Sequence, residues 1–346
     1  MVKENIKNIL IIKWGALGDL IASTSAIKAV RDNFPDAHII LLTNKLMGQI
    51  IPSGFIVDEH IVINTNRNKV TDSFFKQIIT IFKLRKRKID LCINLRWTSE
   101  RAALFTYLSG AKIRVSSGPE KLMNFYTIKL EHPRGRYHEI HRNLDIVKAL
   151  GCKVYDENPV VFISENDQKY ADDFFNKNNL EKLKTICIHP GASKPNRAWL
   201  PDRFAEIAKR LIKNYNAKIL LTWGSGEEDL VKYVSSQIGE GAIISPRTNT
   251  IGQLAAIIKN SGLFFSNCTG PMNVAVAVKT PTVALLGSSH PVDWGAYGDL
   301  HINIKSPLVL EHYSDEDERK AMESLSVDYV WNFVEKKYLE IINKGN

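Results

Sequence analysis

The sequence has few cysteines and no long apolar run. Its 346 residues include four scattered cysteines, with no Cys-x-x-Cys pair and no histidine spacing typical of a zinc site: Cys92, Cys152, Cys187 and Cys268. No apolar stretch reaches the roughly 18 residues that a membrane-spanning helix needs. The apolar run after Lys7 is too short for a signal peptide and is broken at Lys13. We expect reduced thiols, no bound metal and a cytoplasmic location.

Motifs for nucleic-acid recognition are also missing, since the chain shows no helix-turn-helix, zinc-finger or aromatic stacking motif. The composition is nevertheless basic, with 46 Lys and Arg against 37 Asp and Glu and a net charge of +9, so the surface should attract anions. The densest basic run, residues 83–88, follows an apolar helical stretch. We interpret it as a solvated helix end rather than a dedicated binding patch. We predict no nucleic-acid partner.

Short apolar segments alternate with helical patterns along the chain, without internal repeats or low-complexity tracts. The strand candidates are residues 9–12, 39–42, 61–63, 91–95 and 113–115, and then 185–189, 218–222, 243–245, 263–266 and 282–286. This alternation predicts the α/β class with doubly wound parallel sheets. A helical pattern that stops at Gly151 indicates a boundary soon after it. We predict two Rossmann-like domains, 1–160 and 161–325, facing each other across a cleft, followed by a C-terminal helix in 326–346.

The most informative segment, residues 8–20, is an apolar strand that runs into a turn and then a helix. Gly15 and Gly18 bracket the turn, and Asp19 falls at the start of the helix. The turn reads Gly-x-x-Gly, so it is not a dinucleotide fingerprint. Asp19 should lie at the carboxyl end of a strand, where open α/β sheets bind ligands. It is a candidate catalytic base, and a purely helix-capping role remains the alternative.

Two loops in the second half combine glycine with polar side chains. Residues 190–199 contain Ser193, Lys194 and Arg197, and an arginine can donate two parallel hydrogen bonds to a phosphate. Residues 223–228 contain two glycines, which let the backbone approach a ligand, and two carboxylates, which can accept hydrogen bonds from ribose hydroxyls. A Gly-rich turn before an acidic helix start explains the second loop equally well.

A third loop follows the apolar strand 263–266 and opens a helix of small residues. Thr269 is a favourable N-cap and Pro271 a favourable first helical residue. The exposed amides of a helix start, together with the helix dipole, favour a diphosphate. Three glycine-containing loops at consecutive strand ends of one domain predict a nucleotide pocket.

With these motifs assembled, the chain resembles the ADP-heptose:lipopolysaccharide heptosyltransferases, glycosyltransferase family nine, over nearly its whole length. The matching segments occur in order at residues 11–20, 89–95, 108–111, 141–151, 189–193, 199–205, 269–272 and 280–287. The resemblance implies a GT-B fold, with an acceptor-binding N-terminal domain and a nucleotide-sugar-binding C-terminal domain. It also implies a C-terminal helix that packs back on the N-terminal domain.

The resemblance further implies metal-independent, inverting transfer of a sugar from a nucleotide diphosphate donor, ADP-heptose, to a hydroxyl of the lipopolysaccharide inner core. No cofactor is implied, and the basic charge agrees with a transient, peripheral approach to a phosphorylated glycolipid at the inner leaflet. Asp19 matches the family's general base, beside the acceptor-side loop of Gly15 and Gly18. The positions that match donor-binding residues are Ser193, Arg197, Glu227, Thr269, Gly270 and Asn273, with Glu228 as an alternative to Glu227.

Two positions depart from the family pattern Asp-Thr-Gly-Pro-x-His. Cys268 replaces the Asp and cannot accept hydrogen bonds as a carboxylate does, and Asn273 replaces the His and cannot become a cation. Cys268 is better interpreted as a space-filling residue than as a reactive thiol. Two alternatives therefore stay open. One is a glycosyltransferase with another nucleotide-sugar donor and another surface-glycan acceptor, and the other is a degenerate, non-catalytic module that binds a nucleotide sugar or glycan.

Several charged or amphipathic segments belong to no motif. The first-domain cations that can meet acceptor phosphates, or else form ordinary surface, are Arg96, Arg101, Lys121, Arg134 and Arg136. The acidic run 315–318 predicts a solvated loop or helix start. Residues 327–341 have the spacing of an amphipathic helix that packs on the protein rather than on a membrane.

Overall fold

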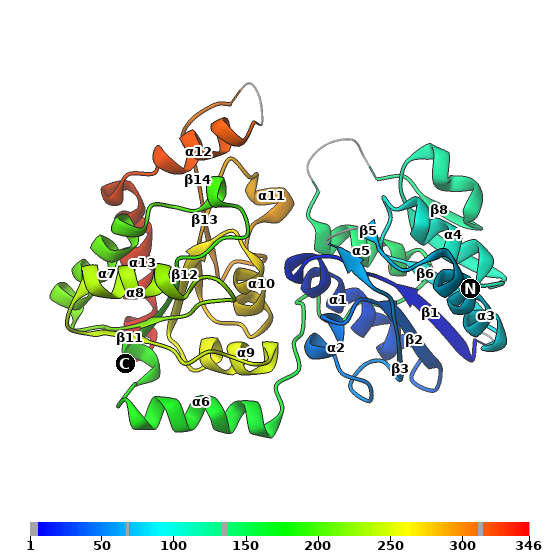
Figure 1. The fold of residues 1–346 in the computed structure, drawn as a ribbon, viewed down its shortest axis with the longest axis horizontal. Helices are drawn as coiled ribbons and strands as arrows, with labels where there is room; N and C mark the ends of the chain where they lie inside the picture. The colour runs from blue at the N-terminus through cyan, green and yellow to red at the C-terminus, as the bar shows by residue number, and fades with distance from the viewer. Residues whose placement is uncertain (1–5, 67–68, 133–136, 311–313, 346) are drawn as a thin grey trace. The chain divides into compact units, whose positions relative to one another are not determined.

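A computed structural model of the chain describes residues 6–66, 69–132, 137–310 and 314–345 (Figure 1). The chain divides into two compact units, residues 1–162 and 163–346. The division falls two residues after the boundary predicted at residue 160. Each unit is built around one six-stranded sheet.

The sheet of the first unit is fully parallel, in the order β3-β2-β1-β6-β7-β8. Its strands are β1 (Asn8–Ile12), β2 (His38–Thr43), β3 (Glu59–Val62), β6 (Leu91–Asn94), β7 (Ile113–Ser117) and β8 (Ile128–Leu130), while β4 (Thr65–Asn66) and β5 (Lys69–Val70) form a separate antiparallel pair. The helices are α1 (Leu17–Asn33), α2 (Met47–Ile50), α3 (Phe74–Lys86), α4 (Glu100–Leu108) and α5 (Glu139–Lys148), with a 3₁₀ turn η1 (Glu120–Phe125). The strand order reverses between β1 and β6, which is where ligands bind in open sheets.

The second unit repeats this topology in the order β11-β10-β9-β12-β13-β14, again fully parallel. Its strands are β9 (Thr185–His189), β10 (Lys218–Leu221), β11 (Ala242–Ile244), β12 (Leu263–Asn267), β13 (Thr282–Gly287) and β14 (Ile302–Lys305). The helices are α6 (Glu165–Lys177), α7 (Pro201–Tyr215), α8 (Glu228–Ile238), α9 (Ile251–Lys259), α10 (Gly270–Ala277), α11 (Pro291–Trp294), α12 (Asp315–Glu323) and α13 (Val327–Gly345), with 3₁₀ turns η2 (Lys182–Lys184) and η3 (Pro195–Arg197). Here the order reverses between β9 and β12.

All ten predicted strands are present, with ends that differ by no more than two residues from the predicted ones. The prediction omitted β8 and β14, the outermost strands on one side of each sheet. Both are short and only partly buried, so they lack the continuous apolar run that marks a central parallel strand. The central strand β1 shows that run clearly, because its residues 9–12 are all fully buried.

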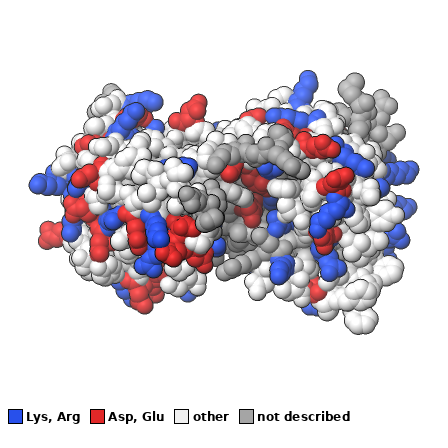
Figure 2. Space-filling model, turned by 90° about the horizontal axis from the view of Figure 1, so that it is seen from above, with Lys and Arg blue, Asp and Glu red and all other residues white. Residues whose placement is uncertain are grey.

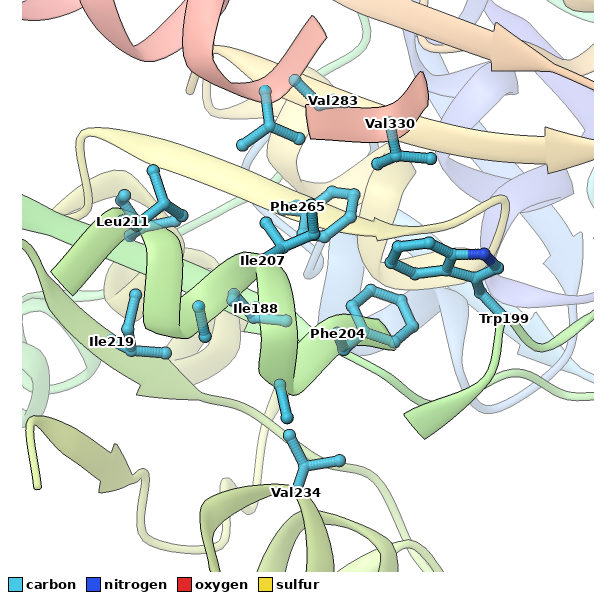
Figure 3. Close-up of a cluster of buried hydrophobic side chains, with 14 of the residues drawn as sticks. Ile188, Trp199, Phe204, Ile207, Leu211, Ile219, Val234, Phe265, Val283 and Val330 are labelled. Carbon is cyan, nitrogen blue, oxygen red and sulfur yellow. The ribbon is translucent and has the colours of Figure 1, made fainter. Parts of the chain in front are cut away.

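The core of the second unit lies between its sheet and helices α7 and α13 (Figure 3). The ring of Phe204 in α7 contacts that of Phe265 in β12 at a centroid distance of 5.0 Å, and it meets the Trp199 ring edge to face at 5.1 Å. Figure 3 shows Val330 of α13 beside this aromatic cluster. Burying aromatic rings of this size contributes several kcal/mol to the stability of the unit, on the order of 1.5–3 kcal/mol each.

The structure corrects the expected position of the C-terminal helix. Its buried residues Val330, Val334 and Tyr338 belong to the core of the second unit, where α13 packs on α7 and on the sheet. The Tyr215 hydroxyl of α7 also donates a hydrogen bond to Glu335 at 2.6 Å. The predicted amphipathic helix is therefore present, but the face that was expected to return to the first domain covers the second unit instead.

Candidate active site

In the first unit, the turn after β1 brings Asp19 to the first turn of α1. The helix begins at Leu17, and its N-cap is Ala16, so the carboxylate of Asp19 lies inside the helix and does not serve as the N-cap. A Cβ atom at Gly15 would stand 2.9 Å from Asp19 Oδ2. The carboxylate therefore packs directly over the glycine backbone, and a side chain at Gly15 would displace it.

Two polar side chains, those of Lys13 and Asn44, support this turn. Lys13, 1% exposed, forms an ion pair at 3.1 Å with Glu139 at the start of α5 and donates a second hydrogen bond to the Leu95 carbonyl at 3.2 Å. The Asn44 amide donates to the Gly15 carbonyl at 2.9 Å. A buried ammonium persists only when it is paired in this way. The sequence analysis assigned Lys13 no ion pair, because its partner lies 126 residues away.

In the second unit, the three predicted loops follow β10, β9 and β12, which are adjacent strands of one parallel sheet. Their carboxyl ends therefore meet at one edge, as the nucleotide-pocket prediction requires. Asn267, the buried last residue of β12, ties two of these loops together. Its Oδ1 accepts from the Trp199 amide at 2.9 Å, and its Nδ2 donates to the Pro190 carbonyl at 2.8 Å. The sequence offered no signal for this role.

Glu227 faces the loop after β9, whereas Glu228 does not. Oε2 of Glu227 accepts a hydrogen bond from the Gly224 amide at 2.7 Å and lies 3.4 Å from His189 Nε2. A Cβ atom at Gly191 would overlap the Glu227 carboxylate, so the glycine makes room for it. Burial lowers the pKa of His189, and the charge of Glu227 opposes that effect. Glu228 instead pairs with Lys232 one turn along α8, at 2.7 Å.

Arg197 lies in η3 with its guanidinium on Glu318 of α12. Nε donates to Glu318 Oε1 at 2.7 Å, Nη2 donates to the same oxygen, and the Asn196 amide donates to Oε2. The acidic run, predicted to be a solvated loop or helix start, is the start of α12. Its fourth residue, Glu318, is not solvated, because it receives these donors and is only 5% exposed. Ser193, three residues before Asn196, is exposed on the same loop.

The N-terminus of α10 presents its first-turn amides without a side-chain cap. Helix α10 begins at Gly270, and within the described structure the Thr269 side chain accepts no hydrogen bond from the first turn. Asn273 donates its amide to the Thr269 carbonyl at 3.3 Å. Uncapped amides at a helix start suit an anion. Thr269, the predicted N-cap, occupies that position by its backbone alone.

Cys268 packs into a small apolar cluster under this turn, beside Met272 and Ala296, and its thiol donates to the Trp294 carbonyl at 3.5 Å. Burial raises the pKa of the Cys268 thiol to about 11, and nearby Arg197 opposes the shift. The thiol is therefore protonated at neutral pH, as expected for a space-filling cysteine.

The first-unit cations have mixed environments. Arg96 follows β6, next to β1 in the sheet, and its buried Nε has no hydrogen-bond partner among the described residues. Lys121 pairs with Glu100 at 2.5 Å, and Arg101 is exposed on α4. Arg134 and Arg136 lie outside the described residues. Basic and acidic side chains are interspersed on the face that Figure 2 shows.

Two open, fully parallel α/β sheets, each the centre of its own unit, give this chain the GT-B fold, which solved heptosyltransferase structures share. The family model of glycosyltransferase family 9 (heptosyltransferase) matches residues 80–325, so the chain belongs to that family and is a glycosyltransferase. Lipopolysaccharide heptosyltransferase 3 of Escherichia coli (strain K12) is 27% identical over 299 residues, which are 80% of this chain and 81% of that protein.

Solved structures share the fold over almost the whole chain. A family 9 glycosyl transferase from Veillonella parvula superposes with a TM-score of 0.81 and 23% identity, covering 98% of this chain and 99% of its own. The E. coli heptosyltransferase WaaC with ADP-2-deoxy-2-fluoro heptose superposes with a TM-score of 0.71 and 17% identity, covering 95% of this chain and 99% of its own.

Along the described part of this chain, no helix is long and apolar enough to cross a membrane, and no three His, Cys, Asp or Glu side chains gather as potential metal ligands.

Proposed function

We propose that this enzyme transfers a heptose from ADP-heptose to a hydroxyl of the lipopolysaccharide inner core, with inversion at the anomeric carbon and without a metal ion. The observation that carries the proposal is the meeting of three loops at the ends of adjacent strands β10, β9 and β12. They offer uncapped helix amides, an arginine and a carboxylate, which match a diphosphate and a ribose. The ADP-heptose analogue bound to WaaC supports this choice of donor.

In the proposed reaction, Asp19 takes the proton of the acceptor hydroxyl as its oxygen attacks the anomeric carbon. The new glycosidic bond forms on the face opposite the diphosphate, and the bond from the anomeric carbon to the phosphate oxygen breaks. The electron pair leaves with the nucleoside diphosphate. Amides at the start of α10 and the Arg197 guanidinium stabilise the charge that develops there. Glu227 and Ser193 complete the donor-binding loops, with Gly270 and Asn273 at the helix start.

The acceptor side is proposed to be the first unit, beside the turn of Gly15 and Gly18. Arg96 is the cation there whose buried Nε has no hydrogen-bond partner in the described structure, so it is a candidate for an acceptor phosphate or carboxylate. A phosphorylated glycolipid acceptor implies that the enzyme works at the inner face of the cytoplasmic membrane, in transient contact with it.

A second candidate function rests on Cys268. Its thiol is protonated at neutral pH and donates to the Trp294 carbonyl, so it cannot accept hydrogen bonds from sugar hydroxyls as a carboxylate would. The same fold and loops would then serve another nucleotide sugar and another surface glycan. A non-catalytic module that binds a nucleotide sugar or glycan is the remaining alternative.

Thermal stabilisation by a panel of nucleoside diphosphates and nucleotide sugars tests the donor. A ligand at about 100 times its dissociation constant adds roughly 2.7 kcal/mol to the stability of the folded state. We expect stabilisation by ADP and ADP-heptose, and heptose transfer to a purified core acceptor. Preference for another nucleotide supports the second candidate. Stabilisation without transfer or hydrolysis of any donor supports the binding module.

A further inference from the structure

Helix α3 of the first unit has an unusual distribution of apolar residues. Of its 13 residues only Leu84 is buried, although the helix is rich in Phe and Ile. Its N-cap residue Ser73 accepts a hydrogen bond from the Lys76 amide, which stabilises the start of the helix. In Figure 1 it runs along the outside of the first unit, in contact with α4.

Helix α3 exposes four large apolar side chains to solvent. Phe74 is 70% exposed, Phe75 76%, Ile79 52% and Phe82 61%. At about 100° per residue these four side chains fall within an arc of roughly 140° that does not include Leu84, and Arg85 and Lys86 continue the same arc at the C-terminal end of the helix. Single exposed apolar residues are ordinary on a protein surface, but a contiguous stripe of three phenylalanines and an isoleucine marks an interaction surface.

Cations border this stripe. Residues 73–89 contain six Lys or Arg and no Asp or Glu, and all six are exposed: Lys76, Lys83, Arg85, Lys86, Arg87 and Lys88. Arg87 pairs with Glu59 at 2.6 Å, and Arg85 donates to the Leu108 carbonyl at 3.1 Å. The other four form no ion pair with any residue that the structure describes. The cations of residues 83–88 lie in the last turn of α3 and just after it, as the interpretation of the run as a solvated helix end predicts, and the exposed aromatic residues lie on the same helix.

We infer that α3 docks the enzyme on an anionic lipid bilayer. A helix with aromatic residues on one face and unpaired lysines at its border lies in the membrane interface, with the rings at the acyl boundary and the ammonium groups among the phosphates. A second copy of the chain is a poorer partner, because symmetric pairing of this face would bring like charges together. The inference deepens the proposed function, on which it rests for the reason why the enzyme visits a membrane.

Co-sedimentation with lipid vesicles tests the inference without requiring activity. We expect the wild-type protein to bind vesicles of phosphatidylcholine mixed with phosphatidylglycerol, and to bind phosphatidylcholine alone at least about tenfold more weakly. The variant Phe75→Gln/Ile79→Gln/Phe82→Gln keeps good helix formers at exposed positions and should lose at least about tenfold in binding. Lys83→Gln/Lys86→Gln should bind more weakly and with a shallower dependence on salt.

A matched control replaces three exposed apolar residues of the second unit, as Val292→Gln/Leu308→Gln/Val309→Gln, and should bind anionic vesicles like the wild type. Failure of the wild type to bind these vesicles, or wild-type binding by the α3 aromatic variant, would overturn the inference. Self-association that the aromatic variant abolishes, without vesicle binding, would overturn it in favour of a second copy. Vesicle binding that depends on α3, in a protein that transfers no heptose to a soluble core acceptor, would refute the proposed function alone.

Discussion

Glu318 holds the guanidinium of Arg197 across 121 residues of sequence, with one carboxylate oxygen accepting from both Nε and Nη2. Arg197 in turn keeps the pKa of the Glu318 carboxyl below its ordinary value. Two of the five donors of the arginine are thus used, and its Nη1 edge remains available to a phosphate. Glu318 therefore positions Arg197, the proposed phosphate-binding residue. It does not use all the hydrogen-bond donors that Arg197 could offer to a phosphate.

Replacing Glu318 by Gln should raise the donor KM several-fold with a smaller change in kcat, because Arg197 loses the group that orients it. The second unit should also lose about 1–2 kcal/mol, since the arginine is half exposed and solvent screens part of the pair. Steady-state kinetics and urea unfolding measure both effects. The control is Glu316→Gln on the same helix, whose carboxylate pairs with Lys320 on the surface. Equal donor KM values for the two variants would contradict the positioning role.

Replacing Asp19 by Asn should lower kcat by a factor of about 10²–10⁴ while leaving donor binding intact, because the amide cannot take the acceptor proton. Donor affinity by calorimetry and transfer rates together make the test. Asp32→Asn on the same helix, which removes an exposed ion pair with Lys28, should behave like the wild type. Unchanged turnover in the Asp19 variant would rule out the base and leave a structural role at the helix start.

The two neighbouring carboxylates at the start of α8 should respond differently to substitution. Glu227→Gln weakens the contacts to Gly224 and His189 that shape the loop facing β9, so the donor KM should rise by about tenfold. Glu228→Gln removes an exposed pair with Lys232 and should leave the donor KM unchanged. If Glu228→Gln proves the more damaging change, the assignment of the nucleoside carboxylate is reversed.

Local patterns predicted the strands and the loops that follow them, because a buried parallel strand and a glycine turn each depend on residues that are adjacent in the sequence. Long-range polar contacts were not predictable in this way. In the sequence, Glu318 belongs to an acidic run that is expected to be solvated, and only the structure shows Arg197 beside it. Lys13 likewise interrupts an apolar run, and only the structure shows its partner Glu139. The C-terminal helix was expected on the wrong unit, since its amphipathic pattern specifies a buried face but not the surface that buries it.

His301, just before β14, should make the protein less stable in mild acid. Burial, assisted by nearby Lys337, lowers the pKa of His301 from 6.5 to about 4. Between these values the unfolded chain binds a proton that the folded protein does not, so stability falls as pH drops from above 6.5 toward 4, by about 2–3 kcal/mol for this residue. Urea unfolding at several pH values should show a shallower decline in His301→Gln. An NMR titration that gives His301 an ordinary pKa would contradict the prediction.

Replacing Gly15 by Ala should impair catalysis although the proposed base, Asp19, is unchanged. The added Cβ would stand 2.9 Å from Asp19 Oδ2 and 3.1 Å from its Cβ, so the carboxylate must move. Because misplacing a reacting group by about 1 Å can cost on the order of a hundredfold in rate, we expect kcat to fall by tenfold or more, with donor binding unchanged. Gly48→Ala in α2, where no described atom lies within 4 Å of the new Cβ, is the matched control. Equal kcat values for the two alanine variants would contradict the prediction, because they would show that the exact position of the Asp19 carboxylate does not limit turnover.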